Sequence, residues 1–240
     1  MQLYYIRHGQ SGNNLLWDQT GSNNGRSVDP ELSPVGQQQA ALLAEFLKSH
    51  GVGGEKRGED NQNQAGFWLT HLYSSLMVRA VSTAQPVARA LGLPLVGWKE
   101  LHEAGGIYRE EKLTGEYTGL PGMNRAYFEQ HCPEMVLPDD LGAEGCWSRP
   151  HESREERYPR AKQVLFDLLR RHGQTADRVA LISHGGFYQY LMGAILGLPD
   201  MMNNSFLLNN AAISRIDFNP PVVTVVYLNR VDFLPSEIIT

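Results

Sequence analysis

The chain has few cysteines and no long hydrophobic run, and each shortage excludes a class of protein. Its 240 residues include only Cys132 and Cys146, too few for the disulfide framework of a small secreted protein, and their spacing matches no metal signature. No apolar run approaches the roughly 20 residues that span a bilayer, and no basic stretch with an apolar core opens the chain. We therefore expect a cytoplasmic protein with reduced thiols and no membrane partner.

An excess of positive charge is also missing. The formal net charge is −5 at pH 7, whereas a protein that mainly binds nucleic acid would need a basic face. Hydrophobic residues make up 42% of the chain, enough for a real core, and 240 residues suit one large α/β domain or two small ones. The composition thus argues against nucleic acid as a partner, and it gives no indication of the oligomeric state.

Strands and helices are predicted to alternate along the chain. Short apolar runs predict strands over 2–6, 67–73, 93–96, 179–182, 212–218 and 222–228, and the last two are expected to form an antiparallel hairpin. Apolar residues at helical spacing predict helices that begin near Ser33-Pro34, Arg79, Ser153 and Phe187. Within two of these helices, Pro86 predicts a kink or break, and Pro159 favours a later start than the capping box of Ser153 and Glu156 indicates.

Two segments do not follow the alternation. Residues 51–66 are polar, glycine-rich and without period, which predicts a mobile surface loop. Residues 104–150 are rich in Gly, Glu and Pro, and we expect them to leave the sheet and form a cap over its carboxyl edge. The fold class is therefore a three-layer α/β/α arrangement on a largely parallel sheet. We expect residues 1–240 to form a single domain with this cap inserted.

A histidine follows each of two short apolar runs. Leu3-Tyr4-Tyr5-Ile6 is followed by Arg7-His8-Gly9, and residues 179–182 are followed by Ser183-His184-Gly185-Gly186. In an open α/β sheet the carboxyl ends of the strands face the ligand crevice. Two histidines delivered to that edge, both beside glycine and one beside arginine, favour a site for the transfer of a phosphoryl group.

Further motifs in the same order make the chain similar to a known family. Arg7, His8, Gly9, Ser11 and Asn14 fit the pattern Arg-His-Gly-x-Ser/Thr-x-x-Asn, and Tyr73-Ser74-Ser75 precedes Arg79-Ala80 and Thr83-Ala84. Glu103 lies in a Leu-x-Glu motif, and His184-Gly185 completes the set. The chain resembles the histidine phosphatase superfamily over nearly its whole length. Within its phosphoglycerate mutase-like branch, it resembles the phosphatases more than the cofactor-dependent mutases.

The resemblance implies a role for each of these residues. His8 would be the nucleophile that forms a phosphohistidine, and Glu103 would be the general acid, with Glu100, Glu110 and Glu111 as nearby alternatives. Arg7, Arg79 and His184 would bind the phosphate and stabilise its charge. Ser11, Asn14 and the backbone at Gly185 are further candidate phosphate ligands, although Ser11 and Asn14 could equally be turn formers.

These roles predict a metal-independent phosphatase that uses no cofactor and hydrolyses a small phosphomonoester. No Cys/His/carboxylate cluster with metal spacing is apparent in the sequence. Mutase-type phosphoryl transfer stays an alternative, although no adjacent arginine pair follows Glu103 within the presumed cap. A catalytically weak protein-interaction module is a second alternative. Arg26, Arg109, Lys112 and Arg125 are candidates to bind a second anionic group of the substrate.

Overall fold

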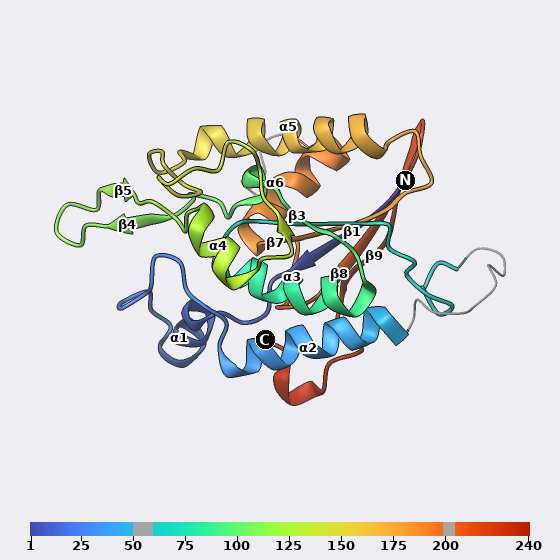
Figure 1. Cartoon of the computed structure of the whole chain (residues 1–240), viewed down its shortest axis with the longest axis horizontal. Helices are drawn as coiled ribbons and strands as arrows, with labels where there is room; N and C mark the ends of the chain where they lie inside the picture. Colours follow the sequence, from blue (N-terminus) through green and yellow to red (C-terminus); the bar gives the residue numbers. More distant parts are fainter. Residues whose placement is uncertain (50–59, 199–204) are drawn as a thin grey trace.

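A mixed sheet of seven strands runs through the centre of the molecule (Figure 1). The computed structural model describes residues 1–49, 60–198 and 205–240. The strand order is β6-β3-β2-β7-β1-β8-β9, and a separate two-stranded sheet joins β4 to β5. The strands are β1 (Gln2–Arg7), β2 (His71–Ser74), β3 (Leu95–Gly97), β4 (Tyr108–Glu110), β5 (Tyr117–Gly119), β6 (Met135–Val136), β7 (Arg178–Ser183), β8 (Ile213–Asn219) and β9 (Val222–Arg230).

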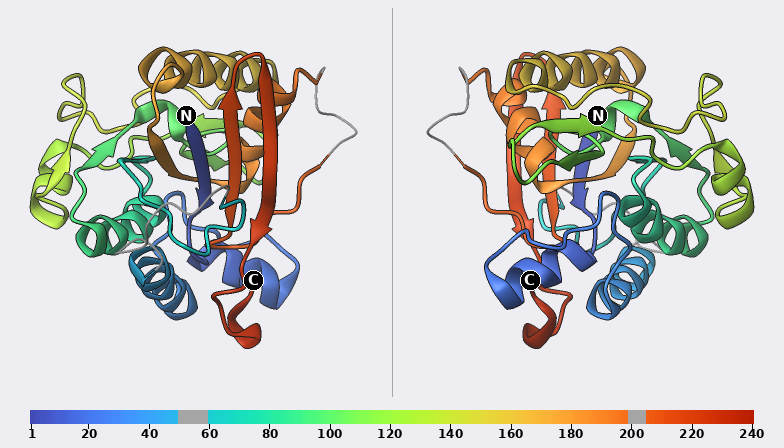
Figure 2. Two further views of the ribbon diagram at one scale, coloured as in Figure 1. Left: turned by 90° about the vertical axis from the view of Figure 1, so that its right-hand side faces the viewer. Right: turned by 90° about the vertical axis from the view of Figure 1, so that its left-hand side faces the viewer.

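Helices cover both faces of the central sheet. α2 and α3 lie on one face, and α5 and α6 lie on the other (Figure 1). The helices are α1 (Gly12–Thr20), α2 (Pro34–Ser49), α3 (Val78–Leu91), α4 (Arg125–His131), α5 (Arg154–His172) and α6 (Gly185–Leu196), with 3₁₀ turns η1 (Lys99–Leu101) and η2 (Ser236–Ile238). The chain end around η2 returns to α2, where Gln39 donates a hydrogen bond to the Ile238 carbonyl at 2.7 Å (Figure 2).

The central strand β1 shows why the sheet needs a helical layer on each face. Leu3 and Tyr5 point into the core beneath α5 and α6, whereas Tyr4 and Ile6 point into the core beneath α2 and α3. All four side chains are fully buried. Successive side chains of a strand point to opposite faces, so an unbroken apolar run must be covered on both. The two cores together confirm the predicted α/β/α layering.

The strand directions also agree with the prediction of a largely parallel sheet. β1, β7, β2, β3 and β6 are mutually parallel in neighbouring pairs. β8 runs antiparallel to β1, and β9 pairs antiparallel with β8, as expected for a terminal hairpin (Figure 2). In the register of β1 with β7, Arg7 lies opposite Ser183. The residues that follow, His8 and His184, therefore leave the sheet side by side.

Several local predictions differ from the structure. Residues 12–20, for which the sequence pattern predicted no helix, form α1, because the side chains of Ser11 and Asn14 cap its first turn. The strand predicted over 67–73 begins only at His71. Pro86 does not break α3, since Ser82, whose carbonyl would lose its intrahelical partner, is only half-buried and can be hydrated.

The start of α5 corrects a further prediction. The helix begins at Arg154, and Pro159 lies inside it rather than delaying it. The capping box is present, because the Glu156 carboxylate accepts a hydrogen bond from the Ser153 backbone N–H at 2.7 Å. The capping residues thus set the helix start, and the proline is accommodated within the first two turns.

The two irregular segments are more integrated than predicted. Residues 51–59 of the predicted mobile loop lie outside the described residues. In the remainder, Asn63 is fully buried and its side chain bonds the hydroxyls of Tyr4 and Tyr227, each at 2.8 Å. Within 104–150, β6 pairs with β3 at the edge of the central sheet, so this segment does not leave the sheet entirely. The hairpin of β4 and β5 does project away from it (Figure 1).

No helix in the described ranges is long and apolar enough to cross a membrane. Cys132 and Cys146 are both free thiols, as predicted. Burial raises the pKa of Cys132 to about 11 and that of Cys146 to about 12, which disfavours the reactive thiolate at neutral pH. Neither cysteine is therefore a candidate nucleophile.

Candidate active site

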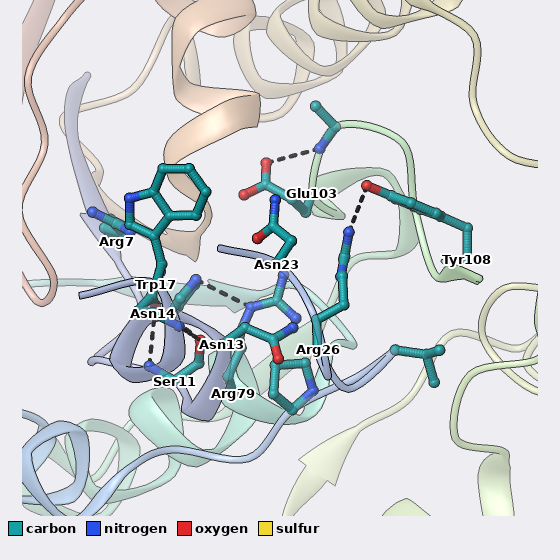
Figure 3. Close-up of a pocket in the computed structure, with 15 residues that line it drawn as sticks. Arg7, Ser11, Asn13, Asn14, Trp17, Asn23, Arg26, Arg79, Glu103 and Tyr108 are labelled. Atoms are coloured by element: carbon teal, nitrogen blue, oxygen red, sulfur yellow. Dashed lines mark hydrogen bonds between the residues drawn. The ribbon is translucent and has the colours of Figure 1, made fainter. Parts of the chain in front are cut away.

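A cavity of about 230 Å³ opens at the carboxyl edge of the sheet (Figure 3). Its wall contains residues from β1, α1, the loop before α2, α3 and the segment after η1. Six of the predicted site residues line it, namely Arg7, His8, Ser11, Asn14, Arg79 and Glu103. His184 and Gly185 are not in the lining. His184 lies fully buried behind the wall, with its ring centroid 5.1 Å from that of His8.

The hydrogen bonds of His8 define its tautomer. Nδ1 lies 2.7 Å from the Gly9 carbonyl oxygen, which can only accept, so Nδ1 carries the proton. Nε2 accepts a hydrogen bond from Arg79 Nε at 3.1 Å and therefore presents a lone pair. Burial, followed by the charges of Arg79 and Arg7, holds the pKa of His8 well below its usual 6.5. His8 is thus a neutral imidazole at neutral pH, as nucleophilic attack requires.

Arg79 is held in place by Asp29, an acid that was not predicted as a site residue. It lies in the first turn of α3, and its Nη1 is 3.4 Å from Asp29 Oδ1. Both oxygens of Asp29 also accept from the Val78 backbone N–H, at 3.2 and 3.3 Å. Asp29 therefore caps the helix and holds the guanidinium toward His8 at the same time.

Arg7 and His184 each keep one buried N–H or ring nitrogen without a partner among the described residues. Arg7 Nη1 donates to the Leu208 carbonyl at 2.6 Å, whereas its Nε is unpaired. His184 Nε2 is 2.8 Å from Ser75 Oγ, whereas its Nδ1 is unpaired. Burying an N–H without a partner costs free energy, and because Arg7 lines the cavity, its Nε could be satisfied there by a ligand oxygen.

The charge state of His184 differs from the cationic donor considered from the sequence. Burial, followed by the charges of Arg79 and other neighbours, holds the pKa of His184 well below 6.5, so the ring is neutral here. A bound phosphate dianion would favour its protonated form.

The absence of a side chain at Gly185 matters for Arg7, because a Cβ at position 185 would lie 3.3 Å from Arg7 Nε. The glycine thus leaves room for the guanidinium.

Glu103 accepts backbone hydrogen bonds at the N-terminus of α6. Its carboxyl group lies in the cavity wall (Figure 3). Oε1 accepts from Ala104 N and Phe187 N, each at 2.8 Å, and Oε2 accepts from Gly186 N at 3.3 Å. Position 186 must be glycine for this contact, since an added Cβ would clash with Oε1 of Glu103. The carboxyl group is thereby fixed in the cavity wall. Glu100, Glu110 and Glu111 do not line the cavity.

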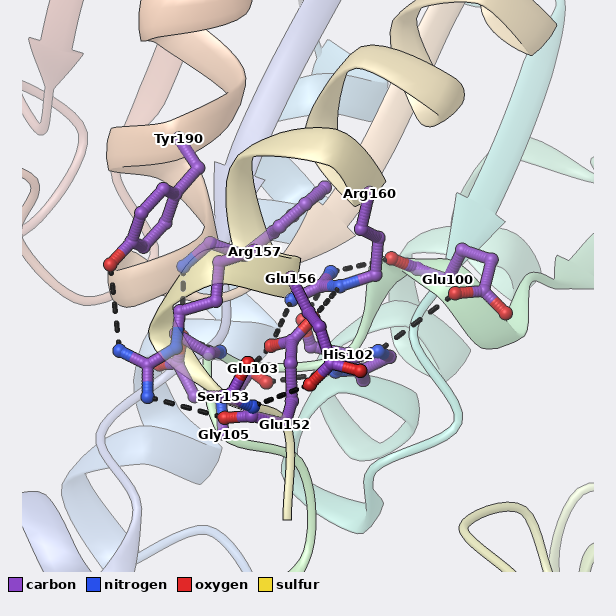
Figure 4. Close-up of polar contacts among 12 residues, drawn as sticks. Glu100, His102, Glu103, Gly105, Glu152, Ser153, Glu156, Arg157, Arg160 and Tyr190 are labelled. Atoms are coloured by element: carbon purple, nitrogen blue, oxygen red, sulfur yellow. Dashed lines mark hydrogen bonds and ion pairs between the residues drawn. The ribbon is translucent and has the colours of Figure 1, made fainter. Parts of the chain in front are cut away.

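A buried ion pair behind Glu103 was not foreseen from the sequence (Figure 4). Arg160 donates from Nε and Nη2 to the two oxygens of Glu152, at 2.5 and 2.9 Å. Arg160 Nη1 also donates to the carbonyls of Glu100 and His102, at 2.8 and 3.1 Å, and Glu152 accepts from Gly105 N at 3.1 Å. The pair therefore holds the backbone on both sides of Glu103.

Ser11 and Asn14 are turn formers that also line the cavity. Asn14 Oδ1 accepts from the backbone N–H and the hydroxyl of Ser11, at 3.1 and 2.9 Å, and Ser11 Oγ accepts from Asn14 N at 3.3 Å. Asn210 also donates to Asn14 Oδ1, at 3.3 Å. The two interpretations from the sequence are thus compatible, because both side chains cap α1 and also line the cavity.

Of the four cations considered for a second anionic group, only Arg26 lines the cavity. Arg125 instead donates to the carbonyls of Leu141 and Pro138, at 2.8 and 2.7 Å. Arg109 and Lys112 are exposed in or beside the β4–β5 hairpin. Their exposure makes them ordinary surface charges rather than part of the site.

At the opposite end of the strands, His71, His172 and Asp177 come together, a grouping that their sequence spacing did not indicate. Their candidate ligand atoms lie within 4.8 Å of one another. However, His172 Nδ1 donates to Asp177 at 2.8 Å, and its Nε2 is 3.0 Å from the Tyr73 hydroxyl. Both ring nitrogens of His172 are therefore already engaged, and the cluster is accounted for as a hydrogen-bonded chain.

Several known proteins are similar to this chain in sequence or in fold. The probable phosphoglycerate mutase GpmB of Yersinia enterocolitica is 28% identical over 222 residues, which cover 91% of this chain and 85% of that protein. Phosphoserine phosphatase of Entamoeba histolytica, solved with 3-phosphoglyceric acid, has a TM-score of 0.60 at 21% identity, covering 98% of this chain and 99% of that one. A mycobacterial glucosyl-3-phosphoglycerate phosphatase, solved with VO3, has a TM-score of 0.53 at 21% identity and covers 90% of each chain.

The structural likenesses concern the fold, whereas the sequence establishes the family. Residues 3–54 and 57–231 match the family model of the histidine phosphatase superfamily (branch 1). The matched ranges contain Arg7, His8, Arg79 and Glu103 of the cavity lining, and also His184 behind it. With nearly the whole chain matched and its fold shared with phosphatases, the protein belongs to branch 1 of the histidine phosphatase superfamily.

Proposed function

We propose that the protein hydrolyses small phosphomonoesters through a phosphohistidine at His8, without a metal ion. The observation that carries this proposal is the tautomer of His8, whose Nε2 lone pair lies beside the guanidinium of Arg79 in the wall of the cavity. A neutral nucleophile beside fixed positive charge is what attack on a phosphate dianion requires, because this chemistry depends on positioning and charge stabilisation. The volume of about 230 Å³ suits a small metabolite.

The two chemical steps follow from the positions of these groups. In the first, the Arg79 Nε–H leaves His8 Nε2 for a phosphoryl oxygen, so that the lone pair of Nε2 can form a bond to phosphorus while the P–O bond to the leaving group breaks. The leaving oxygen takes a proton from Glu103, and Arg7 and Arg79 bind the phosphoryl oxygens. In the second, Glu103 accepts a proton from water as the water oxygen attacks phosphorus. The P–N bond then breaks, and inorganic phosphate and neutral His8 are released.

We propose that segment 104–150 belongs to the same single domain as the sheet. Its role would be to close one side of the cavity. It supplies Ala104, Gly106 and Tyr108 to the lining, while β6 anchors the same segment to the central sheet. Since these residues lie beyond the phosphate, we infer that the segment contacts the part of the substrate that differs between phosphomonoesters.

The test is to trap the phosphoenzyme. The wild-type protein should become labelled by a phosphorus-labelled substrate in an acid-labile, base-stable form, because a phosphoramidate hydrolyses once its leaving nitrogen is protonated. His8→Ala should lose both the label and turnover. Normal turnover by His8→Ala would refute the mechanism. Absence of both turnover and labelling in the wild type would instead favour an interaction module.

Mutase activity is the second candidate, because the similar curated proteins are probable phosphoglycerate mutases. A mutase must retain a doubly phosphorylated intermediate, which calls for additional cationic contacts. Among the described residues, Arg26 is the only cation in the lining besides Arg7 and Arg79. This small number supports hydrolysis. Phosphorus NMR on a phosphoglycerate substrate would separate release of inorganic phosphate from migration of the phosphate between positions.

A further inference from the structure

Arg26 is a cation at the outer part of the cavity. It follows α1 in the chain, and its Nη1 donates to the Tyr108 hydroxyl at 2.8 Å (Figure 3). Its guanidinium carbon also lies 4.6 Å from the centre of the Tyr108 ring. Among the residues that the structure describes, no carboxylate forms an ion pair with Arg26.

Both partners in this contact are fixed from behind. The side chain of Asn13, on α1, donates to the Ser27 carbonyl at 2.8 Å and accepts from Ser27 N at 2.9 Å, which holds the loop that carries Arg26. The Tyr108 ring packs edge-on against the rings of Tyr117 and His151, with centroids 5.2 and 4.6 Å apart. Residues from four parts of the chain therefore determine where the guanidinium of Arg26 lies.

The electrostatics of the cavity give this cation a use. Arg7, Arg26 and Arg79 line the same small cavity, and only Arg79 has a carboxylate, Asp29, within ion-pair distance among the described residues. Burial lowers the pKa of Arg79; the charges of Asp29 and Glu103 oppose this shift, and the nearby charge of Arg26 adds to it. Bringing like charges together costs free energy unless an anion binds between them.

We propose that Arg26, oriented by Tyr108, binds a second anionic group of the substrate, a carboxylate or another phosphate close to the phosphate that is transferred. The proposal rests on the proposed function for the first phosphate, which Arg7 and Arg79 bind. The planar fork of a guanidinium suits both kinds of anion. The substrates are then small phosphomonoesters that have a second anionic group, rather than sugar phosphates or aryl phosphates whose only charge is the phosphate itself.

A matched pair of substrates tests the assignment. 3-Phosphoglycerate and glycerol 3-phosphate have the same length, but the former ends in a carboxylate and the latter in a neutral hydroxymethyl group. Arg26→Met should lower kcat/KM for 3-phosphoglycerate by about 10- to 100-fold, which is the range for losing a hydrogen bond between charged groups. The same variant should change kcat/KM for glycerol 3-phosphate by less than about threefold. Tyr108→Phe keeps the ring but loses the hydroxyl, and it should lower kcat/KM for 3-phosphoglycerate by only about 3- to 10-fold.

The control variant is Arg109→Met. This exposed arginine follows Tyr108 in β4 and is not in the cavity lining. Its loss should therefore leave kcat/KM unchanged for both substrates. Propane-1,3-diol bisphosphate forms a further arm of the experiment. If Arg26→Met lowers kcat/KM for this bisphosphate but not for 3-phosphoglycerate, the second anion is a phosphate. If the variant affects all substrates equally, or affects none, the proposal is wrong.

Binding separates this proposal from the proposed function. Calorimetry on the His8→Ala protein should show tighter binding of 3-phosphoglycerate than of glycerol 3-phosphate, and Arg26→Met should remove the difference. If wild-type protein turns over none of the phosphomonoesters, the proposed function is wrong. The calorimetric comparison of His8→Ala with and without Arg26→Met would still decide whether Arg26 binds a second anionic group. Equal binding of 3-phosphoglycerate, propane-1,3-diol bisphosphate and glycerol 3-phosphate to His8→Ala would refute the second anionic site.

Discussion

Removing the charge of Glu152 should destabilise the protein far more than removing the charge of an exposed glutamate. The side chains of Arg160 and Glu152 are 7% and 6% exposed, so Glu152→Gln leaves a guanidinium buried without a counter-charge. Breaking a buried ion pair in this way costs about 3–5 kcal/mol of the free energy of unfolding. Glu134, whose side chain is 36% exposed, pairs with Arg89 at 2.8 Å, and Glu134→Gln should cost less than about 1 kcal/mol.

Urea unfolding at pH 7 measures both variants, and an unchanged m-value ensures that the difference reports stability. A second pair of changes, Glu152→Leu with Arg160→Met, removes the buried charges together. It should recover part of the lost free energy, but the carbonyls of Glu100 and His102 would still lack their partner. A loss below about 1 kcal/mol for Glu152→Gln would refute this reasoning.

The same double variant tests whether the pair positions Glu103. Arg160 and Glu152 bond the backbone on both sides of Glu103, and the Arg160 guanidinium carbon lies 4.3 Å from the centre of the Phe187 ring. Well below its unfolding temperature, the double variant should lose kcat on alkyl phosphates and keep most of its activity on p-nitrophenyl phosphate, because that leaving group departs without a proton. Equal losses on both substrates would show that the pair serves only stability.

Three further predictions concern the acid, the histidines and the ions. Glu103→Gln should slow an alkyl phosphate by roughly 100-fold and p-nitrophenyl phosphate much less, as judged by phosphate release, and equal slowing would mean that Glu103 only positions the phosphate. Burial, followed by nearby arginines, holds the pKa values of His8, His102 and His184 well below 6.5, so the unfolded chain binds more protons than the folded one below that pH. Stability present at pH 7 should therefore be lost as the pH falls below 6.5, by up to about 1.4 kcal/mol per histidine and pH unit in urea titrations, and a flat profile down to pH 5.5 would contradict this. Chelators should leave activity unchanged while vanadate and phosphate compete with substrate, and a loss of activity that a divalent ion restores would show that the arginines do not suffice.

The main parts of the fold and site could be predicted because they depend on local patterns. An unbroken apolar run followed by Arg7-His8, and a second run followed by His184, suffice to place two histidines at one edge of a parallel sheet. Ser153 and Glu156 likewise mark the start of α5 through a contact three residues apart. In both cases the signal lies within a few residues, so the sequence contains it directly.

The supporting residues could not be predicted because their partners lie far away in the chain. Asp29 meets Arg79, 50 residues later, and Ser75 meets His184 only because β2 and β7 are neighbours. Nothing in the composition around Glu152 or Arg160 indicates that they would be buried together. The choice of Arg26 over Arg109, Lys112 and Arg125 also required the shape of the cavity.

The hydrogen bonds around Arg7 and His8 have a consequence for the order in which the protein matures during synthesis. The Arg7 side chain donates to the carbonyl of Leu208, and the His8 carbonyl accepts from Asn210 Nδ2 at 3.0 Å and from Ala211 N at 3.2 Å. These partners leave the ribosome some 200 residues after the histidine that they support. A nascent chain therefore contains His8 long before it contains the partners that support it, so the proposed phosphate site can assemble only after Leu208, Asn210 and Ala211 have been made.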